Sequence, residues 1–465
     1  MIALPIGVAL TIIFFIVFSQ SAQPILPFQQ EHLPIGGISK PPSTTAFITQ
    51  VAVSGNHVYV LWQQENSTSK NNSVLLRTST DNGFSFNRII NLTRGYDVIY
   101  HPAIVAKNNT LYLTWDDFGG GHTFIRKSID GGITFGNVTL LKDGDGISAG
   151  TSIFLNENDL HAILYNANKD SNGYPINNGI ILRSSFDNGN SFGKTVDLYG
   201  EPYSDRNFLK LAISGKNIYT LGLGKEISQG MYTGVLFRKS SDNGQTFSSV
   251  LNLTGSIYLS DASIAASGNK VYVLVEGANK TRNDLFFTRS IDGGLTFDKM
   301  TKLNNGTAST WFSQLLAYGQ NGVYVKWNSD DSNGEQIVLR KSIDGGSTFD
   351  KTINITQYIK EALPFSPVGI LSENELYAIW EQSSTTPVFH KQIFFTTSID
   401  GGQTFSVPID LNQDNGDYVG IRNLQIVSSG DKIYLAGDSG GDIHGIFLRI
   451  STDGGNTFSH VIHVS

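Results

Sequence analysis

Hydrophobic and polar residues alternate in short stretches along most of the chain, from about Thr45 to the C-terminus. One representative unit reads HPAIVAKNNTLYLTWDD, then HTFIRKSIDGGITF, then GNVTLLKDG. Its four stretches are rich in β-branched and aromatic residues and are separated by Gly, Asn and Asp, a pattern typical of short antiparallel strands joined by tight turns. We label these strands A to D in chain order. No pattern of a long amphipathic helix is visible, so the sequence predicts an all-β protein.

An eight-residue motif lies between strands C and D of every unit. It reads Ser, any residue, Asp, Asn or Gly, Gly, any residue, Ser or Thr, and Phe, and it begins at Ser79, Ser128, Ser185, Ser240, Ser290, Ser342, Ser398 and Ser451. Successive motifs begin 49 to 57 residues apart. Because one four-stranded blade of a β-propeller has about this length, the eight motifs predict a single domain at residues 45–465. We expect an eight-bladed propeller of four-stranded antiparallel blades.

The Asp at the third position of each motif is expected to stabilise its own turn. Asn-Gly and Gly-Gly supply the positive φ angles of a tight hairpin, and a short Asp side chain accepts hydrogen bonds from backbone amides of the turn. A calcium loop needs several oxygen ligands, and one carboxylate per turn is too few. We therefore interpret these residues as structural and expect no metal and no cofactor: Asp81, Asp130, Asp187, Asp242, Asp292, Asp344, Asp400 and Asp453.

Arginines also recur just before the motif, and we interpret them as structural for the same reason: Arg77, Arg126, Arg183, Arg238, Arg289, Arg340 and Arg449. The repeats begin with a strand A and end with a strand D. No closing strand borrowed between the first and last blades is therefore obvious. Ring closure is expected to rest on side-chain packing between these two blades, and the segment before Thr45 is a further candidate contributor.

The motif resembles the Asp box, or BNR repeat, of sialidases and many other β-propeller proteins, and the resemblance covers the chain from about Thr45 to its end. It implies a propeller with an Asp box on each C–D turn, but no single activity, because Asp boxes occur in propellers of unrelated function. Sialidases also carry an Arg-Ile-Pro motif, an Arg triad, a Tyr and Glu pair and an acidic Asp. This sequence contains no Arg-Ile-Pro, so the catalytic residues of that family are not carried over.

Composition narrows the range of partners. The formal net charge is −7, which disfavours nucleic-acid binding because that function needs a basic surface. The chain has no cysteine, so disulfides and thiolate metal sites are excluded. Residues 1–21 contain an uncharged apolar run and predict a cleaved signal peptide, or alternatively a retained membrane anchor. Pro-rich residues 22–44 predict an exposed tether, and both alternatives place the propeller outside the cell.

The two faces of the predicted propeller differ. The A–B turns and the motifs form a rear face that is short and uniform, whereas the B–C and D–A connections form a front face that varies in length and chemistry. Binding residues usually lie on variable loops of a rigid scaffold. Our candidates for ligand binding are therefore the irregular polar and aromatic residues of the front: His101, Asp116, Asp117, Tyr203, Asp205, Arg206, Asp261, Trp311, Tyr418 and Arg422.

Two functions remain open from the sequence. The first is a monomeric, secreted or surface-tethered propeller that binds a glycan or an extracellular protein. The second is a sialidase-like glycoside hydrolase with a rearranged site, which would need two carboxyl groups about 5 to 9 Å apart at the front. Contact with a membrane is expected only through the N-terminal segment.

Overall fold

The structure is a computed structural model, and the residues that it describes lie in the propeller region. They are 44–66, 72–93, 99–117, 121–142, 147–169, 175–199, 209–224, 226–228, 231–255, 258–278, 283–304, 309–331, 334–356, 368–370, 374–384, 390–414, 417–418, 421–440 and 444–465. The predicted signal or anchor at 1–21 and nearly all of the predicted tether at 22–44 lie outside these residues. No helix within the described part of the chain is long and apolar enough to cross a membrane.

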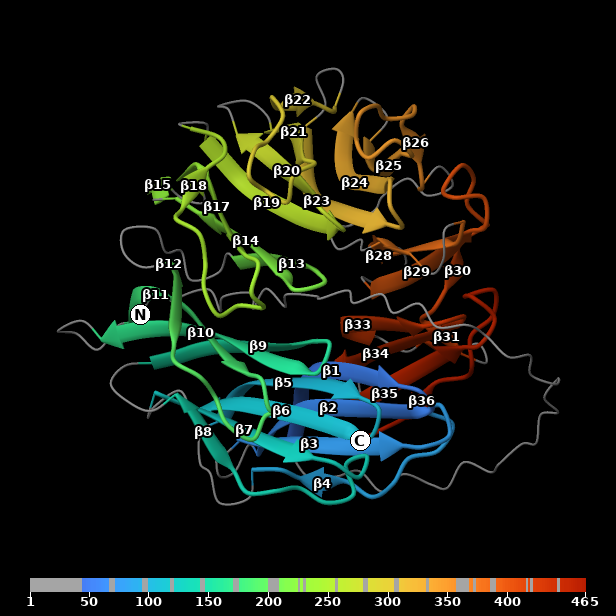
Figure 1. Cartoon of the computed structure of the whole chain (residues 1–465). Coiled ribbons are helices and arrows are strands. Elements are labelled where there is room, and N and C mark those ends of the chain that lie inside the picture. Colours follow the sequence, from blue (N-terminus) through green and yellow to red (C-terminus); the bar gives the residue numbers. More distant parts are fainter. Residues whose placement is uncertain are drawn as a thin grey trace, which may run out of the picture.

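Eight four-stranded antiparallel sheets surround a common axis, which confirms the predicted eight-bladed propeller (Figure 1). The first four blades are formed by β1 (Thr44–Ser54), β2 (His57–Asn66), β3 (Asn72–Ser79) and β4 (Ile90–Asn91); β5 (Ile99–Lys107), β6 (Thr110–Asp117), β7 (His122–Ser128) and β8 (Thr139–Lys142); β9 (Ile147–Asn156), β10 (Asp159–Lys169), β11 (Pro175–Ser185) and β12 (Val196–Tyr199); and β13 (Leu209–Ser214), β14 (Asn217–Leu223), β17 (Val235–Ser240) and β18 (Leu251–Asn252).

The last four blades continue around the ring. They are formed by β19 (Tyr258–Ser267), β20 (Lys270–Ala278), β21 (Asn283–Ser290) and β22 (Thr301–Lys302); β23 (Ser309–Tyr318), β24 (Gly322–Asp331), β25 (Gly334–Ser342) and β26 (Ile353–Asn354); β27 (Val368–Ile370), β28 (Leu376–Ser384), β29 (His390–Ser398) and β30 (Ile409–Asp410); and β33 (Ile421–Ser429), β34 (Lys432–Gly440), β35 (His444–Ser451) and β36 (Ile462–His463). The hairpin of β15 (Glu226–Ser228) and β16 (Met231–Thr233) extends the fifth blade, and β31 (Gln413–Asp414) pairs with β32 (Asp417–Tyr418).

The hydrophobic core consists of eight separate clusters, one between each pair of neighbouring blades. Strand β2 shows how one sequence supplies two of them, because successive side chains of a strand point to opposite faces. Tyr59 and Leu61 pack against the second blade. Val58, Val60 and Trp62 pack against the eighth blade. Both faces of a blade are therefore buried.

The eight motifs lie on the C–D turns and share one geometry. The fourth residue of every motif has a φ angle of 58–75°, and the fifth has one of 78–90°. This explains why the fourth position holds Asn or Gly and the fifth always holds Gly. A steric clash is a second reason for Gly at position 294, because a Cβ atom there would lie 2.6 Å from Cζ of Phe237 in the preceding blade.

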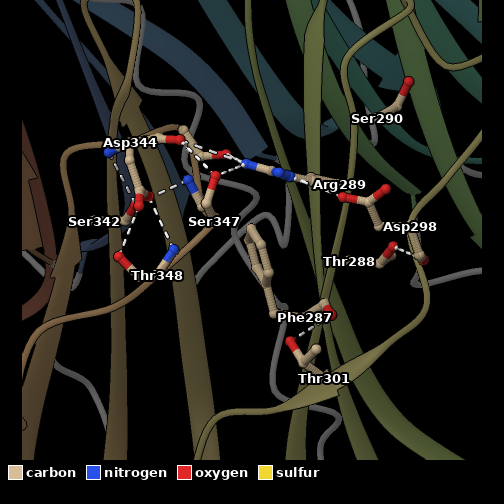
Figure 2. Close-up of polar contacts among 12 residues, drawn as sticks. Phe287, Thr288, Arg289, Ser290, Asp298, Thr301, Ser342, Asp344, Ser347 and Thr348 are labelled. Carbon is tan, nitrogen blue, oxygen red and sulfur yellow. Dashed lines mark hydrogen bonds and ion pairs between the residues drawn. The ribbon is translucent and has the colours of Figure 1, made fainter.

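Hydrogen bonds within each motif fix the Asp side chain. In the sixth blade, Asp344 accepts bonds from the Ser342 hydroxyl at 2.8 Å, from the Thr348 backbone N–H at 2.9 Å and from the Thr348 hydroxyl at 2.7 Å (Figure 2). The Ser342 hydroxyl in turn accepts a bond from the Gly346 N–H at 2.8 Å. The same turn also bonds to the A–B turn of its own blade, since Gly345 N–H donates to the Asn321 carbonyl at 2.9 Å.

The recurring arginines connect neighbouring blades. Arg126, for example, donates to the Leu92 carbonyl of the preceding blade at 3.2 Å. Equivalent bonds run from Arg183 to Leu141, from Arg238 to Leu198 and from Arg340 to Leu303. The bond from Arg77 to the Val464 carbonyl, at 2.8 Å, joins the first blade to the eighth. Together with the apolar cluster between these two blades, it joins the ends of the ring, and no strand of the described residues is exchanged between the first and eighth blades.

Arg289 differs from the arginines with which the sequence grouped it. It stands one residue before its motif, whereas the others stand two residues before theirs, and a one-residue shift turns a side chain to the other face of a strand. Arg289 therefore points to the following blade. There it donates to the Gly345 carbonyl at 2.7 Å and to the Ser347 hydroxyl at 2.6 Å, as Figure 2 shows. Arg449 donates to the Ser459 carbonyl of its own blade at 3.2 Å, as Arg126 does to the Gly136 carbonyl of its own blade.

We expect Asp344→Ala to lower the free energy of unfolding at pH 7 by roughly 1 to 3 kcal/mol through the loss of these hydrogen bonds. The hydroxyl and amide of Thr348 lower the pKa of Asp344 from 3.8 to about 2. Because the folded-state pKa is lowered, the stabilisation is present above pH 3.8 and is lost as the pH falls toward 2. Urea denaturation of the variant and the parent protein at pH 7 and pH 2 measures both effects.

Asp431→Ala serves as the matched control. Asp431 is exposed on a rear turn and contributes its backbone carbonyl to the fold by accepting the Gly454 N–H. Its replacement is expected to change stability by less than about 0.5 kcal/mol. Equal losses in both variants, or an Asp344→Ala loss that persists at pH 2, would contradict the role assigned to the motif carboxylate.

Candidate functional site

Six inner strands depart from regular pairing at the same level, near the front end where strand A enters the sheet. The irregularities lie between Phe47 and Thr49, Tyr100 and Ala103, Leu259 and Asp261, Trp311 and Gln314, and Arg422 and Gln425, and opposite Leu164 and Asn166 in the third blade. Such bulges re-aim side chains and occur often beside functional sites. Here they mark the front end of the axial region as the candidate site.

Polar residues of strand B lie beside these bulges and are buried. They are Gln63, Asp116, Glu276, Asn328 and Asp438, each at most 2% exposed. Polar side chains at this depth require hydrogen-bonding or charged partners. Two of the five, Asp116 and Glu276, make contacts that define the geometry of the site.

In the fifth and sixth blades, two buried charges hold the two ends of a single peptide group. Lys326 on β24 donates to the Phe312 carbonyl at 3.0 Å, and Glu276 on β20 accepts the Ser313 N–H at 2.6 Å. The Phe312 carbonyl and the Ser313 N–H belong to the same peptide bond, which lies in the β23 bulge. We call Glu276 and Lys326 the charged pair. Both are 2% exposed, so burial makes their interaction with this peptide strong.

The peptide held by the charged pair sets the position of Phe312. This residue has a φ angle of 50°, which is strained for a bulky side chain and persists only where the surrounding contacts enforce it. The Phe312 side chain is 49% exposed, and Trp311 beside it is half-buried. The sixth blade thus presents two adjacent aromatic residues at the front.

A second carboxyl group adjoins the charged pair. Asp261 lies in the β19 bulge, accepts the Ala262 N–H at 2.8 Å and faces Lys210 of the fourth blade, with 3.5 Å between the carboxylate oxygen and Nζ. The Asp261 side chain is 30% exposed and that of Lys210 is 26% exposed. Charged groups of three consecutive blades therefore lie beside the β19 and β23 bulges.

Burial changes the acidity of these groups. Burial, together with the Asp261 carboxylate, raises the pKa of Glu276 to about 7. Burial lowers the pKa of Lys326 to about 7, against the opposing effect of Glu276. Burial also raises the pKa of Asp261, although Lys210 acts in the other direction. Strongly shifted pKa values concentrate at functional sites, and their occurrence in one cluster supports this assignment.

A separate polar group lies in the second blade. Asp116 is fully buried and accepts hydrogen bonds from the Thr123 hydroxyl at 2.8 Å and from the Thr151 hydroxyl of the third blade at 2.7 Å. His101 in the β5 bulge has a φ angle of 51°. Its Nδ1 lies 3.5 Å from the other oxygen of Asp116, and its side chain is 34% exposed. The carboxylate thus orients an accessible imidazole at the front.

The remaining sequence candidates do not join these groups within the described structure. Asp117 on β6 lies 3.5 Å from His122 of the same blade, and both side chains are partly exposed. Tyr203, Asp205 and Arg206 lie outside the described residues. For Tyr418 on β32 and Arg422 on β33, the backbone is described and the side chains are not. Among the described residues, no group of three or more His, Asp or Glu side chains forms a possible metal site.

Sequence reasoning identified Asp261 and Trp311 but missed Lys210, Glu276, Phe312 and Lys326. Lys326 left a signal, because VYVKWN places a charge where other B strands have apolar residues or Thr. Phe312 left another, because STWFSQ places two aromatic residues in an inner strand, whereas other inner strands are rich in Ala and Ser. The contact of Glu276 with Ser313 has no signal in the sequence, because it depends on the register between two blades.

No protein-family model and no curated protein matches this chain. Among solved structures, it is similar to an ulvan lyase from a new polysaccharide lyase family, with 13% identity, a TM-score of 0.45 and coverage of 76% of this chain and 92% of that one. It is also similar to an α-L-arabinofuranosidase of Fusarium graminearum, with 14% identity, a TM-score of 0.39 and coverage of 56% and 81%. A leech intramolecular trans-sialidase shows 12% identity, a TM-score of 0.38 and coverage of 85% and 88%.

The charged pair yields a prediction about stability. Glu276→Gln keeps an acceptor for the Ser313 N–H but removes the carboxylate that favours the charged form of buried Lys326, so we expect a loss of roughly 1 to 3 kcal/mol. Lys326→Met should cost a similar amount, and the double variant should cost less than the sum of the two. A double-mutant cycle based on urea denaturation measures this coupling.

The half-exposed pair Lys302 and Asp284 provides the control. Their charged atoms lie 2.8 Å apart, with side-chain exposures of 35% and 15%. Because solvent screens such pairs, Lys302→Met and Asp284→Asn are expected to couple by less than about 1 kcal/mol. A coupling energy for Glu276 and Lys326 that is no larger than this would show that they do not act together on the bulge.

Proposed function

We propose that this protein is an extracellular Asp-box propeller that binds carbohydrate at its front face, over the aromatic residues of β23. The observation that carries this proposal is the presentation of Phe312. Glu276 and Lys326, from different blades, hydrogen-bond the peptide that follows Phe312, and the φ angle of Phe312 is strained. Such strain is costly and is typical of residues with a functional role.

The chemistry around Phe312 suits a sugar. A pyranose or furanose ring has an apolar C–H face that packs on an aromatic ring and a rim of hydroxyl groups that need hydrogen-bond partners. Trp311 and Phe312 supply aromatic surface, while Asp261 and Lys210 supply a partly exposed acceptor and donor. Ligand sites commonly combine an apolar surface with a few fixed polar groups in this way. The uncharged apolar segment at residues 1–21 supports export of the propeller.

One observation favours hydrolysis as a second candidate function. Asp261 and Glu276 are two carboxyl groups that influence each other, and the pKa of Glu276 is raised to about 7. Glycoside hydrolases use two carboxyl groups, one of which must remain protonated as the acid near neutral pH, and a raised pKa allows this. In this reading Asp261, the more exposed carboxyl group, contacts the substrate. The sialidase arrangement of three arginines is not part of the proposal.

A glycan array followed by titration of the strongest binder tests the proposal. Phe312→Ala is expected to weaken binding at least tenfold, since it removes the ring on which the sugar packs. Phe84→Ala is the matched control, because Phe84 is similarly exposed, at 52%, but lies in a motif on the rear face. The Phe84→Ala variant should bind the glycan with the same affinity as the parent protein.

Hydrolysis assays on the same glycan separate the two candidate functions. Binding without turnover, and no release from an aryl sialoside, are expected for the binding function. Turnover that Asp261→Asn abolishes while the fold is kept would establish the hydrolase instead. The proposal fails if no glycan binds, or if Phe312→Ala and Phe84→Ala have the same effect on binding.

A further inference from the structure

The rear face exposes large apolar side chains on its motif turns. Ile129, Ile133, Ile291, Leu295, Ile343 and Ile399 are 65–77% exposed, which places them among the most exposed large hydrophobic residues of the described chain. Each occupies the second or sixth position of a motif, where the side chain leaves the turn. The motif geometry itself does not require apolar residues at these positions, because other blades hold Ser, Thr, Asn or Gln there.

These apolar turns follow a two-fold pattern around the ring. Blades one to three carry Phe84, the two isoleucines of the second motif, and Phe186. Blades five to seven carry the remaining isoleucines and Leu295. Blades four and eight lie between these two sectors and are polar at both positions, with Ser241 and Gln245 in one and Thr452 and Asn456 in the other.

We infer that the rear face binds a second copy of this chain, in place of the monomer expected from the sequence. A two-fold axis that crosses the rear face over blades four and eight maps the polar turns onto themselves. It maps blades one, two and three onto blades seven, six and five. Every apolar turn then meets an apolar turn, which is the self-complementarity that an isologous dimer requires.

The apolar area is sufficient for such a contact. A fully exposed Ile, Leu or Phe side chain offers on the order of 150 to 200 Å², so the eight apolar turn residues present on the order of 800 Å², close to what each partner buries in a standard interface. Single exposed hydrophobic residues are ordinary on a protein surface, but a regular set on one face marks an interaction site.

The charges of the rear face fit a protein partner better than a lipid surface. The motif carboxylates already accept bonds within their turns, and cations lie next to them: Lys127 and Lys239 bond to the Asn188 and Gly293 carbonyls of the following motifs. Binding to an anionic lipid surface needs a surplus of basic residues, whereas this chain has a net charge of −7.

Sedimentation velocity of the purified protein from 1 to 100 µM tests the inference. The parent protein is expected to form a dimer, and Ile343→Asp or Ile399→Asp should raise the dimer dissociation constant at least tenfold. Two charges are then buried per dimer, one from each copy, by the symmetry of the contact. Both positions are at least 70% exposed, so thermal melting should show an unchanged fold.

Leu251→Asp is the matched control, because Leu251 is 42% exposed on the outer strand β18, away from the rear turns. It should dimerise like the parent protein, and so should Phe312→Ala, which alters the front. A monomer throughout the concentration range, or a dimer that Ile343→Asp does not weaken, would overturn the inference. Flotation of the parent protein, but not of Ile343→Asp, with phosphatidylcholine–phosphatidylserine vesicles would assign the rear face to lipid instead.

Discussion

Each blade of this propeller can bury its apolar residues only against its two neighbours, and the rest of the structure depends on this constraint. A single sheet has two faces, and alternation along a strand gives each face its own apolar set, as Tyr59 and Val60 show on β2. Eight clusters at eight contacts follow from it. The contact between the last and first blades is of the same kind as the others. Arg77 donates a hydrogen bond to the Val464 carbonyl across this contact, as Arg126 and Arg183 do across the contacts with their preceding blades.

The motif turns contribute to this packing through their hydrogen bonds. Their Asp side chains accept hydrogen bonds from groups of the same turn, as Asp344 does. Their backbone carbonyls accept hydrogen bonds from Arg or Lys of the preceding blade, as at Gly345 and Gly293. The second and sixth positions are the parts of the motif that remain open to a partner. Repetition therefore characterises the rear face, while the front departs from it at the bulges.

The sequence predicted those features that a local pattern determines. The blade number follows from the repeat, and the turn position follows from Asn-Gly and Gly-Gly, because positive φ angles restrict which residues are possible. The shift of Arg289 was also visible in the sequence, although grouping by proximity to the motif concealed it. The charged pair was not predictable in the same way. Glu276, Ser313 and Lys326 meet only because two blades pack in a particular register and β23 carries an extra residue.

The rear face therefore repeats one turn geometry, and the front face is irregular. Hydrogen–deuterium exchange of the protein, with and without a glycan that binds in the array proposed above, tests this claim most directly. We expect slower exchange on glycan binding in β19 and β23, around Asp261 and Phe312, and unchanged exchange in the eight motifs. Protection of the motifs with no change in β23 would contradict it.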